Sequence, residues 1–154
     1  MDAKYINPVL TSMVNVLSTM AQLEPTPGKP SIKTDGRALG VVTSIIGLEG
    51  PQARGSLAIS FPKPVILDIV RRMLEMETSG TDETACDLTG EISNMVMGGA
   101  KVLLEEQGYD FGLTIPSVQS GEDYEVEHTV EGPTILLPFQ TAAGEFYVEL
   151  RFVE

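Results

Sequence analysis

The chain has little of what most catalytic and metal sites are built from. Its 154 residues include one cysteine, one histidine and no tryptophan. A single cysteine excludes an internal disulfide framework, and without an HExxH or CxxC motif a zinc site has no basis. The one histidine, His128, lies in the acidic run YEVEHTVEG, where we expect a surface strand residue rather than a catalytic base. Phosphate-binding glycine loops are also missing, so nucleotide binding has no support.

Positive charge and long apolar runs are scarce as well. Ten Lys and Arg stand against 22 Asp and Glu, which gives a net charge of -12. Nucleic acid needs a basic surface, so we expect no nucleic-acid partner. No apolar run approaches about 18 residues and no basic, then apolar leader opens the chain, so we expect no membrane contact and a cytoplasmic protein. Length and a hydrophobic content of 42% predict one globular domain over residues 1–154.

The spacing of apolar and turn residues predicts an α+β fold. Asn7 suits an N-cap and Pro8 a first helical position. We expect helices over 7–24, 65–77 and 82–107, and strands over 31–34, 39–50, 56–62, 111–118, 124–130, 133–141 and 146–154. This order favours a single domain with a largely antiparallel sheet, on which two long helices and one shorter helix pack.

Two patterns refine this prediction. The last strand alternates apolar and polar residues, which predicts that Phe146 and Val148 are buried whereas Glu149 lies on the polar side. The first and last helices also align when Asn15 is set against Asn94, which suggests a possible internal pseudo-repeat whose first copy lacks the acid.

The helix over 82–107 carries an unusual polar face in the run DLTGEISNMVMGGAK. At about 100° per residue, a stripe of roughly 80° on one side collects Asp87, Glu91, Asn94, Gly98, Lys101 and Glu105. Asparagine is a mediocre helix former and glycine costs about 1 kcal/mol relative to alanine, so a merely solvated face would favour other residues. Gly98 removes bulk where a partner could approach, whereas Gly99 on the apolar side indicates close packing. A solvated polar face stays the alternative.

The spacing along this face resembles a known signature. Asp87, Glu91 and Asn94 match the pattern (Asp/Ser)-x-x-x-Glu-x-x-Asn of the CheC/CheX family of chemotaxis response-regulator phosphatases. The opening INPVLTSMVNVLSTMAQLEPTPGKP is also similar to the first helix and turn of the CheX branch. Length, element order and a single intact motif agree with that branch.

The resemblance implies removal of the phosphoryl group from the aspartyl phosphate of a phosphorylated CheY-like receiver domain. Asn94 would orient the attacking water and Glu91 would pair with the receiver's lysine. Asp87, Gly98 and Lys101 would contact the partner. The receiver would hold the Mg²⁺, so this chain would bind no metal or other cofactor. The resemblance also implies a homodimer.

Two other functions are compatible with the same residues. A non-catalytic adaptor could bind a receiver or a motor protein with the same fold, although it would have no need of an intact acid and amide pair. A structural domain would leave the polar face as solvated surface, and substitutions at Glu91 and Asn94 would then be silent.

Overall fold

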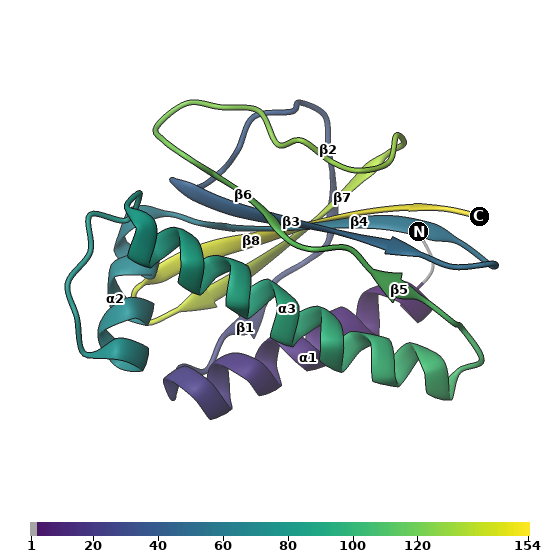
Figure 1. Ribbon diagram of the computed structural model, residues 1–154, viewed down its shortest axis with the longest axis horizontal. Helices are drawn as coiled ribbons and strands as arrows, with labels where there is room; N and C mark the ends of the chain where they lie inside the picture. Colours follow the sequence, from purple (N-terminus) through teal and green to yellow (C-terminus); the bar gives the residue numbers. More distant parts are fainter. Residues whose placement is uncertain (1–2) are drawn as a thin grey trace.

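The computed structural model describes residues 3–154, which form three helices and one sheet (Figure 1). In chain order the elements are α1 (Ala3–Ala21), β1 (Thr26–Pro27), β2 (Ser31–Lys33), β3 (Val42–Glu49), β4 (Arg54–Phe61), α2 (Lys63–Leu74), α3 (Glu83–Glu106), β5 (Gly112–Leu113), β6 (Ser117–Ser120), β7 (Thr134–Thr141) and β8 (Gly144–Val153). The strands predicted over 39–50 and 56–62 correspond to β3 and β4, which pair as a hairpin, and the strand predicted over 31–34 corresponds to β2.

The strands form an eight-stranded sheet in the order β1-β7-β8-β4-β3-β5, with β2 also paired to β7 and β6 also paired to β3. Every pairing between these strands is antiparallel. All three helices lie on one face of the sheet (Figure 1). The predicted α+β class, with helices packed on an antiparallel sheet, is confirmed.

Burial of the sheet follows the period of two on the helix-facing side. In β8, Phe146 and Val148 are fully buried under the helices, as predicted. Glu149 points to the opposite face of the sheet, as predicted. That face is covered at this position, however, and Glu149 is only 1% exposed. The segments 34–40 and 121–132 cross that face, where Val126 packs on Ile45 of β3.

The predicted strand over 124–130 is wrong. Only Glu125 pairs in β fashion, in an isolated bridge with Arg37, and the rest of the segment is irregular. The alternation of polar and apolar residues in the sequence explains the wrong prediction, because Val126 is buried while Glu125 and Glu127 are exposed, as they would be in a strand. A loop laid flat across a sheet is buried on one side only, so it shares the period of two with a real strand.

The predicted start of the first helix is also wrong. Helix α1 begins at Ala3, so Asn7 is not its N-cap and Pro8 lies inside it. A proline there removes one backbone hydrogen bond. Burial of the first turn offsets this cost, because Tyr5 and Ile6 join the core and the Tyr5 ring stacks on Phe152 with 4.2 Å between centroids.

Both predicted ends of α3 are confirmed. The Asp82 side chain accepts a 3.1 Å hydrogen bond from the Ala85 N–H, as an N-cap does. Gly108 adopts φ +92° after the last turn, and the Tyr109 N–H donates to the Leu104 carbonyl at 3.0 Å. This is a Schellman end, which requires the left-handed conformation that glycine adopts without strain.

The two halves of the chain pair in the same way. In each half a helix precedes two short strands and then a hairpin, and α2 joins the halves. The short strands β1 and β2 pair with β7 of the second half, while β5 and β6 pair with β3 of the first half. This arrangement is what an internal duplication would produce, and the pseudo-repeat itself stays a prediction.

Candidate functional site

The polar face predicted for the long helix is an exposed face of α3. Asp87, Glu91 and Asn94 are exposed, and Gly98 and Lys101 are half-buried. The opposite side of the helix is buried, and it consists of Ala85, Leu88, Thr89, Ile92, Ser93, Val96, Met97, Ala100 and Leu104. The helical spacing predicts an apolar side made of Ala85, Leu88, Ile92, Met95, Val96, Gly99 and Leu103. Four of these are among the buried residues, and the prediction missed others, such as Met97 and Ala100.

Close contacts fix α3 against its neighbours. Ser93 Oγ lies 2.7 Å from Ser44 Oγ on β3, and Ser12 Oγ of α1 donates a 2.6 Å hydrogen bond to the Val96 carbonyl. A Cβ at Gly99 would lie 2.4 Å from Ser12 Oγ, so this glycine allows the close approach of α1, as the sequence indicated. A Cβ at Gly98 would meet nothing within 4 Å, so this glycine leaves the surface beside Asn94 open.

The side chains on the exposed face have no partners within residues 3–154. Asp87, Glu91 and Asn94 make no side-chain hydrogen bond or ion pair with any described residue. A carboxylate accepts hydrogen bonds and pairs with a cation, while a carboxamide both donates and accepts. One turn apart, Glu91 and Asn94 can therefore engage a cation and a water molecule of a partner at the same time.

Two hollows adjoin this face. A groove of about 480 Å³ lies between α1 and α3, and its lining is mostly apolar, with Val16, Met20, Met95 and Val102 among the residues that form it. A smaller hollow of about 320 Å³ lies at the start of α3. The smaller hollow is lined by Leu74, Met76, Thr84, Asp87, Leu88 and Glu91. The sequence did not predict either hollow, since each needs two helices to be placed.

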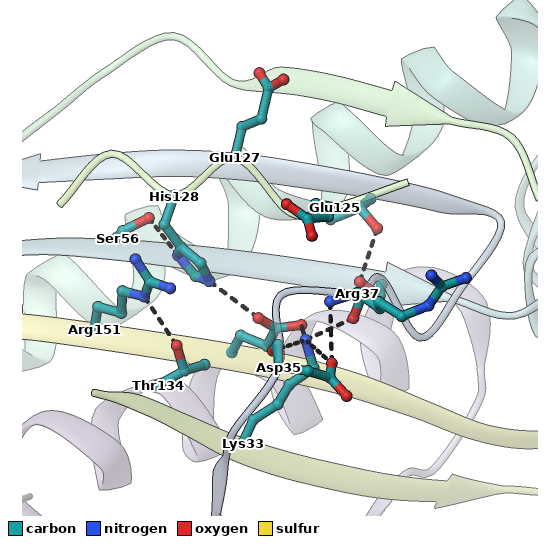
Figure 2. Close-up of polar contacts among 12 residues, drawn as sticks. Lys33, Asp35, Arg37, Ser56, Glu125, Glu127, His128, Thr134 and Arg151 are labelled. Atoms are coloured by element: carbon teal, nitrogen blue, oxygen red, sulfur yellow. Dashed lines mark hydrogen bonds and ion pairs between the residues drawn. The ribbon is translucent and has the colours of Figure 1, made fainter. Parts of the chain in front are cut away.

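A second polar cluster lies on the other face of the sheet. His128 reaches from the segment 121–132 toward Ser56 (Figure 2), and its Nδ1 lies 2.7 Å from Ser56 Oγ. His128 Nε2 lies 3.0 Å from Glu149 Oε1, and Lys33 Nζ lies 3.3 Å from Glu149 Oε2. Serine, histidine and an acid linked in this order are also the residues of a hydrolase catalytic triad. In a catalytic triad, however, the serine bonds to Nε2 of the histidine and the acid bonds to Nδ1.

The buried position of this cluster indicates a structural role rather than a catalytic one. Ser56 is 0% exposed, and the side chains of His128 and Glu149 are each 2% exposed, so no substrate reaches the serine. Ser56 Oγ also accepts a 3.0 Å hydrogen bond from the Thr129 N–H, which holds the same segment. The prediction of a surface histidine is wrong, because the segment folds back over the sheet and carries the ring inside. The cluster fastens residues 121–132 to β4 and β8.

Other kinds of site are not found within residues 3–154. This part of the chain contains no group of three or more His, Cys, Asp or Glu residues that could hold a metal ion. Among the same residues, no helix has the length and apolar character needed to cross a membrane. The candidate site is therefore the exposed face of α3.

Known proteins resemble the whole chain. The family described as "Chemotaxis phosphatase CheX" matches residues 42–140. "CheY-P phosphatase CheX" of Thermotoga maritima is 32% identical over 146 residues, covering 94% of this chain and 92% of that protein. A CheC-like superfamily protein from Shewanella sp. PV-4 matches with a TM-score of 0.91 and 44% identity over 100% of both chains. The CheX-CheY-BeF3-Mg complex of Borrelia burgdorferi matches with a TM-score of 0.78 and 26% identity, covering 97% of this chain and 98% of that chain.

These likenesses agree with the fold. A layer of three helices on an antiparallel sheet, matched over the whole chain by the CheC-like structure, defines a domain of the CheC/CheX-like class. The family match and the Thermotoga relative narrow this class further. The chain belongs to the CheX family of chemotaxis phosphatases.

Proposed function

We propose that this chain hydrolyses the aspartyl phosphate of a phosphorylated CheY-like receiver domain and so ends a chemotaxis signal. Its family and a relative named as a CheY-P phosphatase support the activity. A relative solved in complex with CheY, BeF3 and Mg²⁺ supports the partner and the presence of Mg²⁺ in such an assembly. Trifluoroberyllate is a chemical stand-in for a phosphoryl group, so that complex resembles a phosphorylated receiver.

The observation that carries the proposal is the exposed pair on α3. Glu91 and Asn94 lie one turn apart with no partner among residues 3–154, next to the open surface at Gly98. In the proposed complex Asn94 enters the receiver's active site and holds the water by donating and accepting hydrogen bonds. Glu91 pairs with the receiver's lysine and fixes the register of the helix. Asp87, Gly98 and Lys101 contact the surface around that site.

The chemistry needs no further group from this chain. The water oxygen attacks phosphorus in line, the bond between phosphorus and the aspartyl oxygen breaks, and the receiver's aspartate leaves as a carboxylate. Both protons of the water remain with the inorganic phosphate. Phosphoryl transfer depends mainly on positioning and charge stabilisation, so an amide that orients water suffices. The Mg²⁺ belongs to the receiver in this proposal, and it supplies the charge stabilisation when bound. The homodimer stays a prediction.

The test is the decay of a phosphorylated CheY-like receiver from the same organism, with Mg²⁺ present. We expect the wild type to accelerate phosphate release, and Asn94→Ala to lower kcat by about 100-fold, the usual effect of removing one transition-state hydrogen-bond donor. Glu91→Gln should lower kcat/KM, because the receiver's lysine loses its ion pair. Circular dichroism checks that each variant is folded.

Binding separates the phosphatase from the adaptor. The affinity of the wild type and of Asn94→Ala for the trifluoroberyllate-loaded receiver should be similar, since the amide acts mainly on the water. Binding by the wild type without any acceleration of phosphate release, across all CheY-like receivers of the organism, would instead establish a non-catalytic adaptor.

A further inference from the structure

The end of α2 presents two large apolar side chains beside the proposed catalytic helix. Leu74 is 43% exposed and Met76 is 50% exposed. Both line the 320 Å³ hollow, together with Leu88 on its floor and the carboxylates of Asp87 and Glu91. Exposed apolar groups gathered around a hollow mark a surface that a partner covers more often than a surface that only meets water.

The connection that carries these side chains has a fixed conformation. Glu75 adopts φ +54°, which is uncommon for a residue with a side chain, and its N–H donates to the Arg71 carbonyl at 3.0 Å. Further along, the Thr78 hydroxyl donates to Asp82 and accepts a 3.0 Å hydrogen bond from the Gly80 N–H. These bonds order the backbone on both sides of Met76.

Charge indicates what the hollow accepts. Asp87 and Glu91 stand at its edge, and neither has a cationic partner within the described residues. Apolar walls with acids at the rim fit a side chain that has an aliphatic stem and a positive head, as lysine and arginine do. Such a side chain lays its stem on apolar surface and keeps its charge near the carboxylates.

We propose that this hollow binds a lysine or arginine of the receiver that lies outside the receiver's phosphorylation site. The inference rests on the proposed function and extends it to a second contact. Glu91 serves the active-site lysine, whereas Asp87 holds the head of the second cation, and Leu74, Met76 and Leu88 pack against its stem. The contact discriminates between receivers that carry this cation and receivers that lack it.

The larger groove between α1 and α3 provides a matched control. None of its lining residues is charged, so charge complementarity does not identify an occupant for it. Met20 lines that groove and is 48% exposed, nearly the same as Met76. Met20→Gln therefore repeats the chemical change of Met76→Gln on another part of the helical layer.

The experiment measures dephosphorylation of the CheY-like receiver on which the wild type is active. We expect Leu74→Gln with Met76→Gln to raise KM by about tenfold with kcat unchanged, because apolar packing that is equally strong in the ground state and the transition state contributes only to binding. Asp87→Asn should also raise KM. Met20→Gln should leave both constants within about twofold. Melting temperatures show whether each variant is folded.

A double-mutant cycle then identifies the cation. Each exposed lysine and arginine of the receiver is changed to alanine and assayed against the wild type and Asp87→Asn. We expect one receiver variant that raises KM for the wild type and has no further effect on Asp87→Asn, since coupled residues are not additive. If no receiver cation couples to Asp87, or if Met20→Gln raises KM as much as Leu74→Gln with Met76→Gln does, the inference is wrong. A wild type that is inactive on every receiver overturns the proposed function instead.

Discussion

Ser12 of α1 lies directly against Gly99 of α3, where there is no room for a side chain at residue 99. The Ser12 hydroxyl donates to the Val96 carbonyl at 2.6 Å, and a Cβ on residue 99 would lie 2.4 Å from that hydroxyl oxygen. In the alignment of α1 with α3 that the predicted pseudo-repeat requires, Ser12 takes the position of Glu91, and it is buried and hydrogen-bonded. That alignment therefore places no exposed group opposite Glu91 in α1.

The two adjacent glycines should respond in opposite directions to the same substitution. Gly99→Ala displaces Ser12 and breaks its hydrogen bond, so we expect a loss of about 1–3 kcal/mol in the free energy of unfolding. Gly98→Ala is the matched control, because its Cβ meets open space. It should stabilise the fold by about 0.5–1 kcal/mol through helix propensity alone. Urea denaturation measures both, and equal stability of the two variants would contradict the packing described for Ser12.

The buried cluster on the second face of the sheet predicts a large effect of a residue far from α3. His128→Ala removes the ring nitrogen that contacts Glu149 and leaves that buried carboxylate with Lys33. We expect a loss of about 3 kcal/mol in the free energy of unfolding, because the variant leaves a cavity in place of a buried ring and removes the hydrogen-bond partner of Ser56 and Glu149. Urea denaturation measures this loss for the whole fold, and hydrogen exchange of the backbone amides in residues 121–132 measures it for the segment.

An exposed ion pair on the same segment provides the control for the His128 variant. Arg37 contacts Asp123 at the surface, where both side chains are more than half exposed. Arg37→Ala should cost no more than about 1 kcal/mol, since water and salt screen such pairs. Similar losses for the two variants would show that the segment is held by its surface contacts rather than by the buried cluster.

The N-cap of α3 predicts a dependence of stability on pH. The hydrogen bonds from the Thr78 hydroxyl and the Ala85 N–H hold the pKa of Asp82 below its ordinary value of 3.8. The charged form is thus favoured in the folded state, so its contribution is present above that ordinary value and is lost as pH falls through the lowered pKa. Asp82→Asn keeps a capping side chain without the charge. Its melting temperature should lie below that of the wild type at neutral pH and approach it below pH of about 4.

The boundaries of α3 and its exposed face could be predicted because they depend on local chemistry. Asp82 and Gly108 end the helix through bonds to their own neighbours, and a period of 3.6 residues separates Glu91 and Asn94 from the core. The roles of these two side chains depended on the family resemblance, because no contact within the chain distinguishes them from other exposed residues.

The features that the sequence did not predict depend on distant parts of the chain. Strand β1 has two residues, so only its pairing with β7 makes it a strand, and the strand predicted over 111–118 is divided into the short strands β5 and β6, which pair separately with β3. The inward ring of His128 depends on the opposite face of β8, and the hollow at Leu74 depends on α2 ending at that residue rather than at 77.

Because the short strands of each half pair with the hairpin of the other half, each half completes the sheet of the other. The outer edge of β7 is covered by β1 and β2, and that of β3 is covered by β5 and β6, so cutting the chain between α2 and α3 would strip an edge from both hairpins. Uncovered strand edges invite aggregation. We therefore expect the two fragments to be insoluble when produced apart and to form an ordered sheet only when they are refolded together.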